Sequence, residues 1–178
     1  MKGIFWQEGE SFTNSMSLIV SLLVRYPSIA TISLDPALKS FQFTFVIAHL
    51  LSSSEFERFA QRVKESMETV VNLAGRAPRL LDLSLSRFEG LSFIEVKRDI
   101  DSLLPGEIAL LAALIDEEFE GELVRDQEEG LEEEDQVIQE EMIEHMLEDL
   151  KDSRQEKKLI GFREEGRVMV FNRASFHK

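Results

Sequence analysis

The sequence has no cysteine, few glycines and prolines, and no hydrophobic run long enough to cross a bilayer. Without cysteine the chain has no disulfide, no thiolate metal ligand and no cysteine nucleophile, which is typical of a reducing, intracellular compartment. The most apolar window, residues 16–24, is about half of the roughly 20 residues that a transmembrane helix needs. Residues 1–12 contain two glutamates before any long apolar run, unlike a secretory signal peptide. We therefore expect a cytoplasmic protein with no membrane-bound part.

Short catalytic and nucleotide-binding motifs are also missing. None of the three histidines belongs to a Gly-x-Ser-x-Gly context, and the chain has no phosphate-binding glycine loop or dinucleotide fingerprint. Glu95, Asp99 and Asp101 are interpreted as solvated charges at the end of a strand, since acidic residues are mostly exposed. The sequence calls for no cofactor and leans against an enzyme, although a site built from scattered residues would leave no motif.

The net charge of −14 is concentrated in one part of the chain. Residues 1–115 carry 11 basic and 13 acidic side chains, residues 116–152 carry 2 and 18, and residues 153–178 carry 7 and 3. A nearly neutral body is thus followed by a strongly acidic segment and a basic tail. A negative chain disfavours nonspecific binding to nucleic acid, because attraction to phosphate is electrostatic.

Residues 54–75 are predicted to form a long amphipathic helix. Ser54 and Glu57 have the spacing of a capping box, and Gly75 can adopt the left-handed conformation that ends a helix. Burying one large apolar side chain is worth roughly 1.5–3 kcal/mol, so this helix must pack on a sheet or on other helices. Its apolar residues recur at intervals of three and four: Phe56, Phe59, Ala60, Val63, Met67, Val70, Val71 and Ala74.

The order strand, strand, helix occurs twice along the first 120 residues. In each strand apolar and polar side chains alternate, and in each helix apolar residues recur with the helical period. A hairpin followed by a helix is a common unit, so the pattern does not require a duplication. The strands are expected at residues 28–34, 40–49, 79–87 and 91–98, and the helices at 12–25, 54–75 and 104–119.

These elements predict an α+β fold, in which two ββα units form an antiparallel sheet of about four strands packed with helices. The fourth strand is apolar on both sides, since Ile94 and Val96 point to one face and Leu91 and Phe93 to the other. Such a sheet needs cover on both faces, from the first helix or from a second copy of the chain. We expect residues 1–120 to form this core domain.

Residues 121–178 are expected to form a second unit, packed on the core or on a partner subunit. An acidic loop leads to a long acidic helix, and a basic β-hairpin follows. One side of the helix is apolar and the opposite side is nearly all carboxylate. The loop is expected at 121–135, the helix at 134–154 and the hairpin strands at 158–163 and 167–172.

Our first functional hypothesis is a non-catalytic, self-associating protein that binds other proteins. The acidic helix and the basic hairpin have complementary charge, so they can engage another subunit or a protein partner. The apolar side of the helix is rich in methionine, which suits adaptable contact surfaces. The residues of this interface would be Met142, Met146, Leu150, Arg163, Arg167 and Arg173.

The alternative is a nucleic-acid-associated regulatory factor that uses the basic hairpin. Its lysines and arginines are interleaved with phenylalanines, a combination that provides phosphate contacts and base stacking in single-stranded nucleic-acid binders. Glu164 and Glu165 at the tip of the hairpin would repel phosphate. We therefore favour a hairpin that neutralises the acidic helix.

A second alternative is a metal-assisted hydrolase. Glu141, His145 and Glu148 share one face of the acidic helix and could present carboxylate and imidazole groups to a divalent cation. They lie opposite the apolar side, in water, without the ordered surroundings that tune a functional metal. A solvated acidic face is therefore the preferred interpretation.

Overall fold

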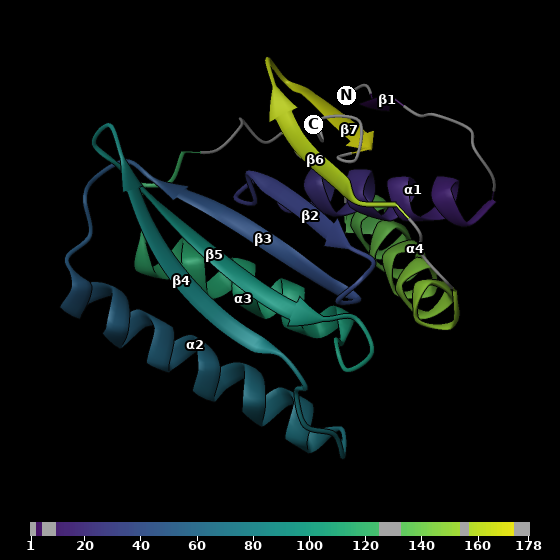
Figure 1. Ribbon diagram of the computed structural model, residues 1–178, viewed down its shortest axis with the longest axis horizontal. Helices are drawn as coiled ribbons and strands as arrows, with labels where there is room; N and C mark the ends of the chain where they lie inside the picture. Colours follow the sequence, from purple (N-terminus) through teal and green to yellow (C-terminus); the bar gives the residue numbers. More distant parts are fainter. Residues whose placement is uncertain (1–2, 5–9, 125–132, 154–156, 173–178) are drawn as a thin grey trace.

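The computed structural model describes residues 3–4, 10–124, 133–153 and 157–172. Within these ranges seven strands form one sheet and four helices pack on it (Figure 1). None of the helices in these ranges combines the length and hydropathy needed to cross a bilayer. The strands are β1 (Gly3–Ile4), β2 (Thr31–Asp35), β3 (Ser40–Ile47), β4 (Leu81–Phe88), β5 (Leu91–Asp99), β6 (Leu159–Glu164) and β7 (Arg167–Asn172). The helices are α1 (Glu10–Arg25), α2 (Ser53–Leu73), α3 (Pro105–Glu118) and α4 (Glu133–Asp152).

The strands are ordered β1-β7-β6-β2-β3-β5-β4 across the sheet. β1 runs parallel to β7, and every other neighbouring pair is antiparallel. The predicted α+β class, with its four core strands and its C-terminal hairpin β6–β7, is confirmed. The hairpin extends the core sheet, since Gly161 of β6 is paired with Ile32 of β2. The sheet therefore contains strands from both predicted units.

The buried apolar side chains of the strands point to one face of the sheet. The register places Ile32 beside Phe43, Phe43 beside Val96, and Val96 beside Leu83, and all four side chains are buried. Figure 1 shows α1 and α3 behind the strands, on this buried face. The fold has two layers, a sheet and a layer of helices, and the described part of the chain places no helix on the other face of the sheet.

The N-terminus of α2 is fixed by a capping box two residues before the predicted one. The Ser52 hydroxyl accepts the N–H of Glu55 at 3.1 Å, and the Glu55 carboxylate accepts the N–H of Ser52 at 3.2 Å. The predicted pair of Ser54 and Glu57 is therefore wrong, because the same Ser-x-x-Glu spacing occurs at both places. Gly75 has a φ of 77°, which confirms its left-handed conformation after the helix.

The predicted acidic loop begins as an addition to the sheet. Leu123 forms an antiparallel bridge with Ile47, and the N–H of Val124 donates to the carbonyl of Val46 at 2.9 Å. This segment lies beside the end of β3, beyond the point where β2 begins to pair with it. Residues 119–124 belong to no helix or named strand, as the predicted loop requires, but this bridge fastens them to β3; residues 125–132 lie outside the described ranges.

Candidate functional site

A buried ion pair lies at the end of β5, where the sheet meets α3. The side chains of Arg98 and Glu107 are both 0% exposed. Arg98 donates from Nε and Nη2 to the two carboxylate oxygens of Glu107, at 2.8 Å each. Glu107 Oε2 also accepts the N–H of Leu104 at 2.7 Å, which ties the first turn of α3 to the pair. Because two parallel hydrogen bonds fix both position and direction, this pair sets the angle between β5 and α3.

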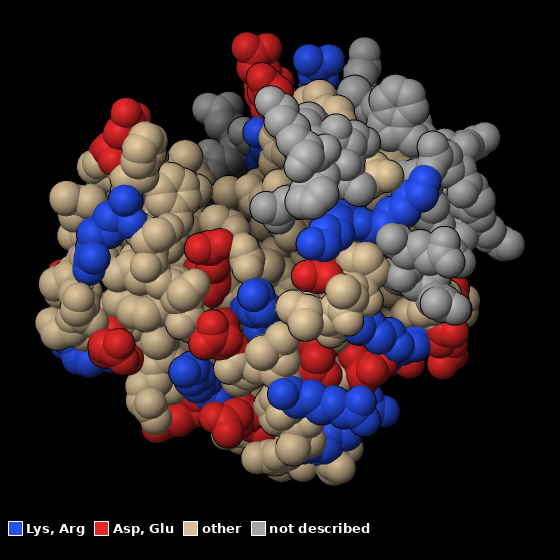
Figure 2. Space-filling view, in the orientation of Figure 1, with Lys and Arg blue, Asp and Glu red and all other residues tan. Residues whose placement is uncertain are grey.

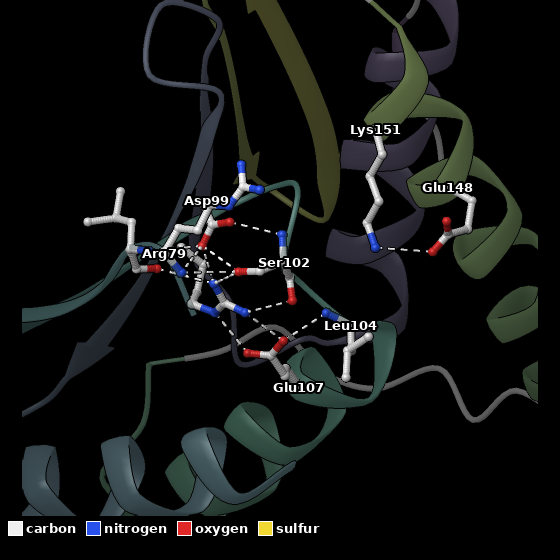
Figure 3. Close-up of polar contacts among 9 residues, drawn as sticks. Arg79, Asp99, Ser102, Leu104, Glu107, Glu148 and Lys151 are labelled. Carbon is white, nitrogen blue, oxygen red and sulfur yellow. Dashed lines mark hydrogen bonds and ion pairs between the residues drawn. The ribbon is translucent and has the colours of Figure 1, made fainter. Parts of the chain in front are cut away.

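Asp99 and Ser102 complete the network around the guanidinium (Figure 3). Arg98 Nη1 donates to Asp99 Oδ1 and to Ser102 Oγ, and the hydroxyl and the N–H of Ser102 donate to Asp99 at 2.7 and 2.9 Å. Burial alone would raise the pKa of Asp99, but the hydrogen bonds from Ser102 and Leu80, with the charge of Arg98, lower it below its ordinary value. The interpretation of Asp99 as a solvated charge is wrong, since this residue is buried.

A polar cleft of about 440 Å³ lies beside this network. It is bounded by the segment that leads into β4, by the β5–α3 connection and by the end of α4. Ser102 belongs both to the network and to the cleft, whereas Glu148 and Lys151 close the cleft from α4 (Figure 3). The lining residues are Arg76, Ala77, Arg79, Asp101, Ser102, Glu148, Lys151 and Asp152.

Basic and acidic side chains pair around the cleft. Lys39 Nζ lies 2.8 Å from Asp101 Oδ1 and donates to the carbonyl of Lys151 at 2.7 Å, so it fastens the end of α4 to the β2–β3 turn. Lys151 Nζ lies 3.1 Å from Glu148 Oε1, and Arg79 Nη1 lies 3.6 Å from Asp101 Oδ2. The lining holds basic and acidic side chains in equal number and no histidine. The lining therefore favours neither an anionic nor a cationic ligand. It also offers no imidazole that could activate a nucleophile.

Among the described residues, no helix covers the sheet face opposite α1 and α3, which we call the bare face; Figure 2 shows it from the same side as Figure 1. Over β3, β4 and β5, residues without charge make up most of the described surface in this view, with a few charged side chains between them. An antiparallel sheet commonly leaves one face in water, but that face is then mainly polar. Apart from Ser40 and Asp99, which are buried, these residues of β2, β3, β4 and β5 lie on the bare face by the register and are exposed or half-buried: Thr31, Ser33, Gln42, Thr44, Val46, Asp82, Ser84, Ser86, Phe88, Leu91, Phe93, Glu95 and Lys97.

Five apolar residues form a continuous strip across one end of the bare face, and we call them the apolar row: Val124, Val46, Phe93, Leu91 and Phe88. Val46 is paired with Phe93, Leu91 is paired with Phe88, and Val124 is hydrogen-bonded to Val46. Directly opposed residues have Cβ atoms roughly 4.5–5.5 Å apart, which brings the two members of each pair into contact range. Phe93 and Leu91 are alternate residues of β5, so they lie side by side on the same face and join the pairs. Phe88 is 65% exposed and Val124 is 47% exposed. The apolar row is therefore accessible.

The predicted apolar side of the acidic helix is divided between core and surface. Leu150 is buried and Met146 packs partly buried against the core, whereas Met142 is 54% exposed. The buried side of α4 consists of Ile143, Leu147 and Leu150, and α4 packs against α1. Of the three helix residues in the predicted interface, only Met142 is freely accessible.

The basic residues of the hairpin occupy different environments. Arg163 Nη2 donates to the carbonyls of Tyr26 and Ile29 at 2.8 and 2.9 Å. Arg163 therefore fastens β6 to the segment between α1 and β2. Arg167 is exposed at the start of β7, and Arg173 lies outside the described residues.

The predicted metal ligands lie on the surface of α4. Glu141, His145 and Glu148 are exposed, and Glu148 is paired with Lys151. Over residues 3–4, 10–124, 133–153 and 157–172, no group of three or more His, Asp or Glu side chains is placed to hold a metal ion. The described residues give no geometry for a metal-assisted reaction.

The buried pair of Arg98 and Glu107 was missed from the sequence. A signal was present, because the alternation of β5 places Arg98 on the same face as Ile94 and Val96, which point into the core. A charged residue at an inward strand position is rare unless it is paired. Its partner was harder to identify, because a glutamate in the first turn of a helix is already explained by the helix dipole.

No family model, no curated protein and no solved structure matches this chain. Neither fold nor function can be transferred from a relative. The function proposed below depends on the chain's own geometry.

Proposed function

We propose that this protein is non-catalytic and acts through contacts with other proteins, including a second copy of itself. The observation that supports this proposal is the apolar row on the bare face of the sheet. Contiguous apolar surface on a folded protein favours a partner that removes it from water. Protein interfaces characteristically have an apolar, aromatic centre and a polar rim.

The surroundings of the apolar row have the composition of such a rim. Thr44, Glu95 and Ser84 form the next paired row along the sheet, and Gln42, Lys97 and Asp82 form the row after it. Phenylalanine provides a large contact area and loses little conformational freedom when a partner covers it. The centre would supply affinity, and the mixed charges beside it would set the orientation of the partner.

The acidic surface of α4 supports a role in protein recognition that is separate from the bare face. Val137, Ile138 and Met142 are each more than half exposed on this helix, among exposed carboxylates. A patch of this kind suits a partner segment that is apolar and basic. The clustered negative charge would accelerate encounter with such a partner at low ionic strength.

A photoreactive phenylalanine analogue at position 93 tests the proposal in cells. We expect a discrete cross-linked species, because the apolar row would be covered by a protein. The matched control has the analogue at Gln61, which is exposed on α2. The same products from both positions, or no product from either, would reject protein binding through the bare face.

The alternative proposal is a nucleic-acid-associated factor, which one observation favours. Phe162 and Phe171 are stacked on the bare face, with ring centroids 5.6 Å apart and planes inclined by 23°. Aromatic rings on an open antiparallel sheet can stack on unpaired bases. Binding of a random RNA or DNA pool should then weaken in Phe162→Ala and in Arg167→Ala. Absence of binding by the unmodified chain would remove this alternative.

A further inference from the structure

β4 forms one edge of the sheet and presents unpaired backbone groups. The N–H of Asp99 donates to the carbonyl of Leu80, and the register that pairs Leu81 with Arg98 places these two residues opposite each other one step further along. Along an antiparallel strand the hydrogen-bonding direction alternates. Even-numbered residues of β4 therefore bond to β5, and the N–H and C=O groups of Leu81, Leu83 and Leu85 point away from the sheet. Among the described residues, β4 has no strand on that side.

The sequence of β4 lacks the residues that usually protect a free strand. β4 has eight residues without proline, glycine or lysine, whereas β1 at the opposite edge has two residues. Proteins commonly block exposed edges with short strands, prolines or inward-pointing charges, because an open edge pairs readily with another chain. Asp82 and Arg87 are the charged residues of β4, and neither lies at its centre.

We infer that β4 pairs antiparallel with β4 of a second copy, around a two-fold axis at Ser84. This inference rests on the proposed function, since it specifies how the protein associates with itself. A two-fold axis perpendicular to the sheet keeps each side chain on its own face, so paired residues must both be even or both be odd. The axis then lies at a residue and not between two residues.

The side chains of β4 select Ser84 as that residue. With the axis at Ser84, Leu83 lies opposite Leu85 of the second copy, and Asp82 lies opposite Ser86. With the axis at Leu85, Asp82 would lie opposite Phe88, which places a carboxylate on an aromatic ring. With the axis at Leu83, fewer residues pair. The Ser84 arrangement has no like charges directly opposed, and opposed like charges destabilise a sheet.

This self-complementarity favours a second copy over an unrelated extended peptide. Leu81 and Leu85 are half-buried on the sheet face that carries the helices. The apolar side chains of the second copy would bury these two leucines further. The two bare faces would join into one larger surface that carries an apolar row at each end. A partner protein with two-fold symmetry could then engage both apolar rows.

Disulfide trapping tests the position of the axis, because the chain has no cysteine of its own. Ser84 points its backbone groups toward β5, so two opposed copies of it form a non-hydrogen-bonded pair with Cα atoms about 4.5 Å apart. That spacing is within the range of a disulfide. Under mild oxidation Ser84→Cys should give a covalent dimer about tenfold faster than Thr44→Cys, which lies on the bare face of a central strand. Equal rates, or faster trapping at position 44, would overturn the inference.

Charge substitutions provide a second measurement that does not depend on oxidation. Ser84→Lys and Ser84→Glu should each shift the sedimentation of the chain toward monomer, because like charges then meet across the axis. A mixture of the two variants should recover the dimer, which also shows that both variants fold. Dimers in each variant alone, or monomers in the mixture, would overturn edge pairing. Cross-linking from position 93 tests protein binding through the bare face independently of β4. A failure of edge pairing can therefore be distinguished from a failure of the proposed function.

Discussion

Both carboxylate oxygens of Glu107 accept hydrogen bonds from Arg98, and neither side chain reaches solvent. Attraction between buried charges is offset by the loss of their hydration, so such a pair contributes less net stability than its geometry suggests. Its effect is on specificity. A guanidinium buried at the end of β5 is stable only when a carboxylate lies beside it. The fold must therefore place α3 where Glu107 can supply that carboxylate.

Removing the charge of Glu107 should be strongly destabilising. Glu107→Gln leaves the Arg98 guanidinium buried without its full counter-charge, which we expect to cost roughly 3–5 kcal/mol of unfolding free energy. Denaturant unfolding followed by circular dichroism measures this loss. The control is Glu117→Gln, which removes an exposed partner of Arg62 and should leave the unfolding free energy nearly unchanged, because water and salt screen an exposed ion pair. Equal losses in the two variants would contradict the assignment of Arg98 and Glu107 as a buried pair.

Acid should weaken the fold partly through Asp99. Its pKa is below the ordinary value of 3.8, so the folded state binds a proton there less readily than the unfolded state. The stability from Asp99 is therefore fully present above pH 3.8 and is lost as the pH falls through the pKa of the folded state. Unfolding free energies measured from neutral to acidic pH should fall less steeply below that point in Asp99→Asn. Parallel curves for the two proteins would show that Asp99 is not held as a carboxylate by Ser102 and Leu80.

The parts of the fold with a regular pattern were predictable from the sequence. The intervals of three and four in α2 identified a buried side that includes Phe56, Phe59 and Val63, and all three are buried. The alternation in β5 correctly separated Ile94 and Val96 from Leu91 and Phe93. In these elements the hydrophobic period has a single solution, because shifting it by one residue would place polar side chains in the core.

The orientation of α4 was not predictable in the same way. Two apolar lines overlap on this helix, one through Met142 and Met146 and the other through Ile143 and Leu147, and they meet at Leu150. Packing against α1 selects the second line, and Arg25 Nη2 lies 2.7 Å from Glu140 Oε1 between the two helices. That contact joins residues far apart in the sequence, so helical periodicity alone could not indicate it.

A charge on the buried side of α2 should unfold the protein. Val63 is 0% exposed, and Val63→Asp would bury a carboxylate without a partner. The expected loss exceeds about 3 kcal/mol, which is a large part of the stability of a typical domain. Thermal unfolding measures it, with Gln61→Asp at an exposed position of the same helix as control. An unchanged melting temperature in Val63→Asp would contradict the burial of this side of α2.

Gly161 allows α1 to approach the sheet, and a methyl group there should be harmful. A Cβ at this position would lie 2.3 Å from Ile19 Cγ2, closer than carbon atoms can approach, and a tight 3.0 Å from Leu23 Cδ1. Because Ile19 Cγ2 is bonded directly to Cβ, it cannot move aside without a rotamer change. We expect Gly161→Ala to lower the unfolding free energy by about 1–3 kcal/mol.

A double-mutant cycle distinguishes this steric effect from a general intolerance of substitution in β6. Ile19→Ala removes the clashing carbon and should by itself cost roughly 2–5 kcal/mol by opening a cavity beneath β6. In that background the methyl group of Gly161→Ala enters the space, and alanine is also preferred over glycine within a strand. The second substitution should then be neutral or stabilising, with a coupling free energy of about 1 kcal/mol or more. Additive losses would mean that α1 does not pack against Gly161.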